Sequence, residues 1–108
     1  MTLYGVTLRW SLHATPNGVS EQLRAYVAGT AAAGGLPDLH QTLWTLREGG
    51  FFGITYVFRS EQSRAESVRR MRAQGSEVNR ILGHSADAIE EFDVLAVASA
   101  DAPPPTAG

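Results

Sequence analysis

Three histidines are the side chains of this sequence best suited to proton transfer near neutral pH. They stand at His13, His40 and His84, and each could serve as a general base or as a metal ligand. The 108 residues contain no cysteine and no lysine, which excludes thiolate nucleophiles, thiolate metal sites and Schiff-base lysines. The histidines form no spaced metal-binding motif, so we predict no metal site.

Large aromatic side chains are the second group that could build a site. Trp10, Trp44, Tyr56 and Phe58 could together line a cavity for a flat aromatic molecule. Ligand pockets are mostly apolar with a few polar groups, and these four side chains fit that description. The same residues could equally be core. No cofactor-binding motif accompanies them, so we expect no cofactor.

Two periods of apolar residues predict the elements that position these side chains. Alternation at every second residue is typical of strands, and spacing of three and four residues is typical of helices. Strands are predicted at Tyr4–Leu12, His40–Arg47, Phe51–Arg59 and Ala88–Ala98. Helices are predicted from an N-cap at Ser20 to a stop at Gly34-Gly35, at Glu61–Gln74, and in a short piece at Ser76–Leu82. This β-α-β-β-α-β order predicts one α+β domain over residues 1–99, followed by a disordered Ala/Pro-rich tail over residues 100–108.

The faces of the predicted sheet indicate a partner. Two helices can cover only one face of four strands, and the other face carries Thr7, Arg9 and Thr55 beside Leu3 and Val57. That face is too apolar for comfortable exposure, so we predict a homodimer in which two sheets pair. The last strand carries apolar residues on both faces, and we expect it to be buried on both sides.

Several segments of the chain are similar to a known superfamily. They are Val6 to Trp10, the Gly-Leu-Pro turn at Gly35–Pro37, Leu43 to Thr45, Gly53 to Phe58 with Ser60-Glu61, and Ile89 to Val94. In these segments the chain resembles the dimeric α+β barrel (ferredoxin-like) superfamily, especially small cofactor-independent monooxygenases related to antibiotic-biosynthesis monooxygenases. The resemblance implies an antiparallel sheet with helices on one face, pairing into a dimeric α+β barrel. The helix Glu61–Gln74 carries neither tryptophan nor histidine, which argues against haem binding.

The resemblance also implies a site. Its strand order, fourth-first-third-second, brings the end of the first strand and the start of the fourth to one edge. His13 and His84 would meet there as base and partner at the mouth of a pocket, although two solvated loop histidines would fit the same positions. In such monooxygenases an aromatic substrate reacts with oxygen through its own anion, and Arg9, His13 or Arg59 would assist in forming and holding that anion. The implied catalytic set is therefore His13, His84 and Arg9. The implied substrate-binding set is Trp10, Trp44, Tyr56 and Phe58.

Two other classes of function were weighed. An RNA-recognition motif has the same element order, but Gly49 stands where it needs a basic residue, and Ile54 where it needs an aromatic one. The net charge of −2 also disfavours nucleic acid. A non-catalytic module that binds a small ligand or another protein stays open.

The remaining charges and the apolar runs predict a soluble protein. The arginine-rich helix, with Arg64, Arg69, Arg70 and Arg72, is interpreted as a solvated face, with phosphate binding as the alternative. No apolar run approaches the roughly 20 residues that cross a bilayer. The first residues lack the pattern of a secretory signal, so we expect a cytoplasmic protein.

Overall fold

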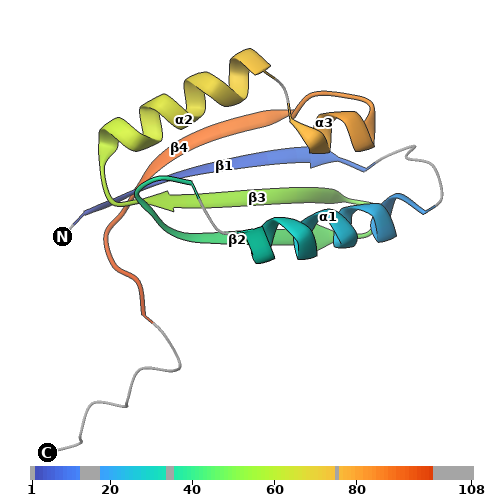
Figure 1. Cartoon of the computed structure of the whole chain (residues 1–108), viewed down its shortest axis with the longest axis horizontal. Helices are drawn as coiled ribbons and strands as arrows, with labels where there is room; N and C mark the ends of the chain where they lie inside the picture. Colours follow the sequence, from blue (N-terminus) through green and yellow to red (C-terminus); the bar gives the residue numbers. More distant parts are fainter. Residues whose placement is uncertain (1, 13–17, 34–35, 75, 99–108) are drawn as a thin grey trace, which may run out of the picture.

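The computed structural model describes residues 2–12, 18–33, 36–74 and 76–98. Within them it contains strands β1 (Leu3–Ser11), β2 (Leu39–Arg47), β3 (Phe51–Phe58) and β4 (Ala88–Val94), and helices α1 (Val19–Ala33), α2 (Glu61–Gln74) and α3 (Glu77–Leu82) (Figure 1). The predicted elements are all present, and their ends differ from the prediction by a few residues. The predicted tail at residues 100–108 lies outside the described residues. No described helix is both long enough and apolar enough to cross a membrane.

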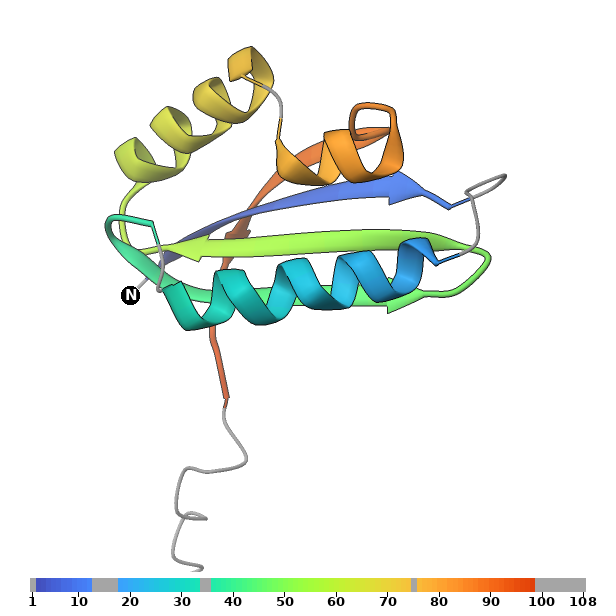
Figure 2. The same cartoon turned by 45° about the vertical axis from the view of Figure 1, so that its right-hand side comes forward.

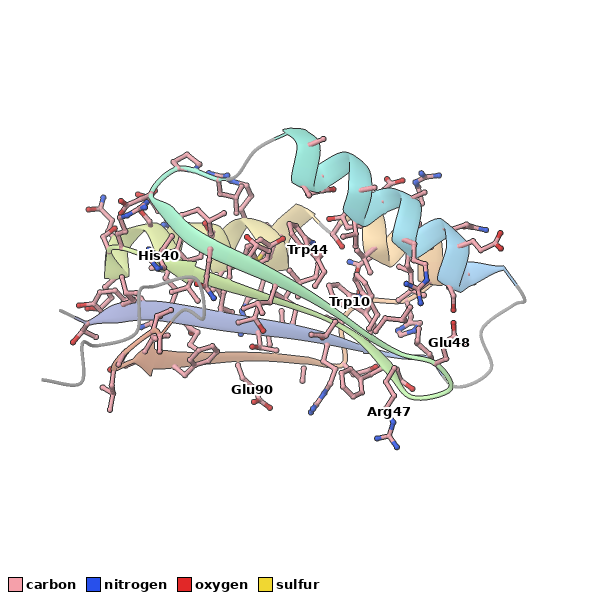
Figure 3. The ribbon with its side chains drawn as sticks, turned by 90° about the horizontal axis from the view of Figure 1, so that it is seen from below. Trp10, His40, Trp44, Arg47, Glu48 and Glu90 are labelled. Atoms are coloured by element: carbon pink, nitrogen blue, oxygen red, sulfur yellow. The ribbon has the colours of Figure 1, made fainter. Side chains whose placement is uncertain are left out.

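The four strands form one antiparallel sheet in the order β2-β3-β1-β4. This is the order implied by the resemblance, read from the other edge. In the middle of the sheet, Leu8 of β1 is the register partner of Ile54 in the neighbouring strand β3 and of Ile89 in the neighbouring strand β4. The three helices lie on the same side of the sheet (Figures 2 and 3). The architecture is therefore the predicted ferredoxin-like α+β fold.

The core lies between this sheet and its helices. Val6, Leu8 and Trp10 alternate along β1, point toward the helices and are almost fully buried. Because side chains alternate across a strand, the two-residue period of the sequence puts all three on one face. The Trp10 ring packs against Phe52 of β3 with 6.0 Å between ring centres.

Serine caps and one glycine set several helix ends. Ser60 accepts a hydrogen bond from the backbone amide of Ser63 at 3.2 Å, which caps α2 as predicted. Gly83 ends α3 in the left-handed conformation, with φ of 78°. The predicted start of α1 was wrong by two residues, because an N-cap at Ser20 would make Glu21 the first helical residue and the helix begins at Val19.

Strand β4 differs most from the prediction. It ends at Val94, four residues earlier than predicted, and it is not buried on both faces. β4 is an edge strand that pairs only with β1, so much of its surface faces solvent. The Phe92 ring lies over Gly5 on the open face, where a Cβ added to Gly5 would stand 2.2 Å from it. Leu95, just past the strand, is 83% exposed.

Arg64 joins helix α2 to β4. Its guanidinium donates to the Phe92 carbonyl at 2.8 Å and lies 3.5 Å from a carboxylate oxygen of both Glu91 and Asp93. It also lies 5.3 Å from the centre of the Tyr4 ring. The interpretation of this helix as a uniformly solvated face was therefore wrong for Arg64, whose side chain is 11% exposed.

Candidate functional site

A cavity of about 430 Å³ lies between helix α1 and strands β2 and β3. Its wall includes Tyr26 and Thr30 of α1, Thr42 and Trp44 of β2, and Tyr56 of β3. The volume is within the range of small-molecule pockets, and the lining is mainly apolar with several hydroxyl groups. We call this space the α1 cavity.

The local sequence explains why these side chains converge. Thr42 and Trp44 are two residues apart on β2, so both face the helices, and Thr42 stands opposite Tyr56 in the β2–β3 register. Tyr26 and Thr30 are four residues apart on α1 and share its inner stripe. Beyond Thr30 the lining residue is the small Ala31, which leaves space between the helix and the sheet.

Trp44 separates the α1 cavity from a neighbouring cavity of about 310 Å³, which Leu23 and Phe52 help to line. The indole ring borders both spaces. Its Nε1 is buried and has no hydrogen-bond partner among the described residues. An indole nitrogen can only donate, and a buried donor without a partner costs about 1–3 kcal/mol. Among the described side chains that line these two cavities, the Trp44 indole N–H is the buried polar group without a hydrogen-bond partner.

Tyr56 supplies a hydroxyl that stays protonated. Burial, with a smaller contribution from the nearby Tyr26, raises the pKa of Tyr56 to about 12. Its ring also stacks on Phe58 with 6.2 Å between ring centres. At neutral pH Tyr56 is therefore a fixed, neutral phenol that can donate a hydrogen bond but cannot act as a base.

The raised pKa predicts a loss of stability in alkali. The native state holds the Tyr56 proton up to about pH 12, whereas the unfolded state releases it near pH 10. The stabilisation is therefore complete below pH 10 and lost as the pH rises to 12, by about 2–3 kcal/mol for a shift of this size. Urea denaturation at several pH values should show this loss in the wild type and in the control Tyr4→Phe. Tyr56→Phe should be nearly flat over the same range, and an equal loss in that variant would contradict the assignment.

The described lining of the α1 cavity holds no proton acceptor that is strong at neutral pH. The polar side chains of its described lining, apart from Trp44, carry hydroxyls, and none carries a carboxylate or an imidazole. No group of three or more histidine and acidic side chains within the described ranges could hold a metal ion. The chemistry open to this lining is hydrogen bonding to an oxygen atom of an otherwise apolar molecule.

The predicted aromatic set is divided by the structure. Trp44 and Tyr56 line the α1 cavity, and Phe58 lies behind Tyr56, fully buried. Trp10 is elsewhere in the core, where its indole nitrogen donates to the Asn79 side-chain oxygen at 2.7 Å. Figure 3 shows both tryptophans on the helix side of the sheet, and Asn79 belongs to α3.

The two described members of the predicted catalytic set, Arg9 and His84, do not line the α1 cavity. Arg9 is exposed on the opposite face of the sheet, with its guanidinium 5.9 Å from the centre of the Phe51 ring. His84 lies where β1 ends, with Nε2 3.1 Å from the Ser11 carbonyl oxygen and Nδ1 2.9 Å from that of Ser85. His13 lies outside the described residues. The end of β1 and the segment before β4 do lie together, as the strand order implied.

Sequence reasoning did not single out Tyr26, Thr30 or Thr42 as site residues. Tyr26 and Thr30 are spaced as on one face of a helix, and Thr42 is a residue typical of a strand. A signal was present, because a tyrosine and a threonine on an inner stripe place hydroxyls where a core would carry aliphatic groups. This stripe forms a cavity wall because residues of β2 and β3, such as Thr42 and Tyr56, line the opposite side of the space.

Comparison with known proteins gives independent support for the fold assignment. At the level of sequence, no protein-family model matches the chain and no curated protein is similar to it. A protein of unknown function from Nitrosomonas europaea is similar in structure, with TM-score 0.67 and 19% identity over 92% of this chain and 95% of that one. A putative antibiotic biosynthesis monooxygenase from Chloroflexus aurantiacus gives TM-score 0.56 and 15% identity, over 90% of this chain and 97% of that one.

A dimeric ferredoxin-like protein of unknown function from Thermobifida fusca is also similar, with TM-score 0.52 and 14% identity over 87% of this chain and 90% of that one. All three identities are below 25%, so the likeness concerns the fold and not the chemistry. Together with the antiparallel sheet and its one-sided helix layer, these comparisons confirm that the chain has the ferredoxin-like α+β fold that the resemblance predicted.

Proposed function

We propose that the chain is a cofactor-independent monooxygenase, or a closely related enzyme, that acts on a small aromatic or polyketide-like molecule in the α1 cavity. The observation that carries the proposal is a largely apolar space of about 430 Å³ with phenol and threonine hydroxyls on its wall. The indole ring of Trp44 contributes to the same wall. The fold similarity to a putative antibiotic biosynthesis monooxygenase supports the same class of reaction.

The proposed reaction places few demands on the protein. An anthrone loses a proton from its ring CH₂ group, and the carbanion passes electrons to dioxygen, so that this carbon forms a bond to one oxygen atom. Loss of the second C–H proton with cleavage of the O–O bond then gives C=O, and the second oxygen atom leaves as water. The protein must hold the anion away from bulk water and stabilise its oxygen. Tyr56 suits this role because it keeps its own proton and can donate it in a hydrogen bond to the substrate oxygen.

The first proton requires an acceptor. The α1 cavity supplies none among its described lining residues, so the substrate enters as its anion or passes its proton to a group outside the cavity. Arg9 lies on the opposite face of the sheet and His84 lies at the end of β1, so neither reaches a ligand in the α1 cavity. We propose His13, His84 and Arg9 as the catalytic set of an alternative site at that end of β1. The experiment below therefore includes His84 and Arg9.

Oxygen consumption with a panel of anthrones and hydroquinones tests the proposal. We expect turnover in the wild type and about a tenfold loss in Tyr56→Phe, because one hydrogen bond to the substrate oxygen is removed. The matched control is Tyr4→Phe, since Tyr4 stacks under Arg64 and lies outside the α1 cavity. Turnover that is unchanged in Tyr56→Phe but lost in His84→Ala or Arg9→Gln would move the site to the far end of β1.

A non-catalytic ligand-binding module is the second candidate, favoured by the absence of carboxylate and imidazole from the described lining of the α1 cavity. The two tryptophans allow a direct test. In Trp10→Phe the remaining indole is Trp44 at the cavity wall, and its fluorescence should change when a ligand binds. Saturable quenching without oxygen uptake across the whole panel would establish binding and reject the enzyme.

We also propose that two copies of the chain pair through the open face of the sheet. At the centre of that face the hydroxyls of Thr7 and Thr55 bond to each other at 2.8 Å, so they need no water there. Leu43 and Phe92 are apolar and 47% and 37% exposed on this face. Figure 3 shows Arg47 and Glu90 pointing away from the helices, which provides charged groups around the apolar part.

A further inference from the structure

A third cavity, of about 330 Å³, lies on the other side of the core from the α1 cavity. Helices α2 and α3 form one wall, and β1 with the start of β4 forms the other. Leu8, Trp10 and Ile89 make an apolar floor, whereas the rim carries Arg72 and Asn79. We call this space the α3 cavity.

The Asn79 side chain has a fixed orientation. The Trp10 indole can only donate, and it donates to the Asn79 oxygen at 2.7 Å, which identifies that atom as the carbonyl oxygen. The amide nitrogen of Asn79 then carries two N–H groups, and no described residue accepts a hydrogen bond from them. The backbone amide of Asn79 also donates to Ser76 at 3.2 Å, which holds this residue in the first turn of α3. The α3 cavity therefore has a pre-oriented donor.

Arg72 adds a positive charge at the same rim. Two acidic side chains of the surrounding elements are engaged elsewhere, since Glu91 pairs with Arg64 and Glu77 pairs with Arg80. Among the described residues no carboxylate forms an ion pair with Arg72. A guanidinium and an amide N–H₂ above an apolar floor favour a ligand with a negative oxygen-bearing group and a hydrophobic body.

We propose that the α3 cavity binds a small organic carboxylate. The apolar body rests on Leu8, Trp10 and Ile89, and the carboxylate accepts hydrogen bonds from the Arg72 guanidinium and the Asn79 amide. The planar fork of arginine matches the two oxygens of a carboxylate. This site is separate from the α1 cavity, and the proposal holds whether or not the α1 cavity performs oxygen chemistry.

Titration with three probes tests the α3 cavity, using benzoate, benzamide and acetate. Benzoate has both the ring and the charge, benzamide has only the ring, and acetate has only the charge. The measurement is the NMR shift of the Trp10 indole N–H and the Asn79 side-chain amide in the full chain. We expect saturable shifts with benzoate and affinities at least tenfold weaker for the other two, since each lacks one half of the recognition.

Arg72→Gln should weaken benzoate binding about tenfold and leave benzamide unchanged. Arg70→Gln is the matched control, because Arg70 is an exposed arginine of the same helix that does not line the α3 cavity. Both substitutions are at exposed positions and should leave the fold intact. No saturable shift with millimolar benzoate, equal affinity for benzoate and benzamide, or an equal loss in Arg70→Gln would overturn the proposal.

Discussion

Trp10→Ala should lower the free energy of unfolding by about 3–5 kcal/mol, the usual cost of removing a large aromatic side chain from a core. Trp10 is only 1% exposed, and its ring packs against Phe52. The substitution also removes the donor that satisfies the Asn79 side-chain oxygen. Urea denaturation followed by circular dichroism measures the change without depending on tryptophan fluorescence.

Trp44→Ala is the matched control, and its expected cost is smaller, at about 1–2 kcal/mol. Trp44 is half-buried, borders two cavities, and has an indole N–H with no described partner, so fewer packing contacts are lost. An equal cost for the two tryptophans would identify Trp44 as core and weaken the α1 cavity as a binding site. Because natural domains are only marginally stable, Trp10→Phe provides a milder second variant that keeps a ring and removes the hydrogen bond.

The two-residue period of the first strand predicted the centre of the fold because a buried strand leaves a direct trace in the sequence. Val6, Leu8 and Trp10 alternate with smaller or polar residues, and β1 is one of the two central strands, which are paired on both sides and covered by helices. The order of the elements then restricted the topology to a few arrangements. The structure confirms that part of the prediction.

The error at β4 arose because apolar residues on both faces can indicate either a central strand or an edge strand that meets a partner. Phe92 and the exposed Leu95 suggested two-sided burial, but β4 lies at the edge of the sheet. The acidic residues of this strand, in contrast, indicated that part of it faces solvent. Glu90 is exposed, and Glu91 and Asp93 contact Arg64, a long-range ion-pair arrangement that no local pattern of the sequence reveals.

The candidate site could be predicted only in part because a cavity is a volume and not a sequence pattern. Trp44 and Tyr56 were singled out as aromatic residues suited to a pocket, and both line the α1 cavity. The space itself lies between helix α1 and β2, where Thr30 and Ala31 line one side and Thr42 lines the other. Those residues lie far apart in the sequence, so their combined effect appears only in the folded chain.

Leu43→Arg should convert a dimer of the wild-type chain into a monomer, if two copies pair through the open face of the sheet. Leu43 lies on β2, opposite Thr55, next to the hydrogen-bonded pair of threonines at the centre of that face. An arginine there would place two like charges near each other in the symmetric pair, and charge burial without a partner costs several kcal/mol. We therefore expect at least a hundredfold weaker association.

Light scattering on the full chain at micromolar concentration measures this change directly. The wild type should show about twice the 11.6 kDa mass of one chain, and Leu43→Arg should show the mass of one chain. Ala25→Arg is the control, because Ala25 is exposed on α1, on the helix side of the molecule. Leu43 is already half exposed in a single chain, so Leu43→Arg should keep its circular dichroism spectrum. A monomeric wild type, or a Leu43→Arg variant that stays dimeric, would show that the open face is not the contact between copies.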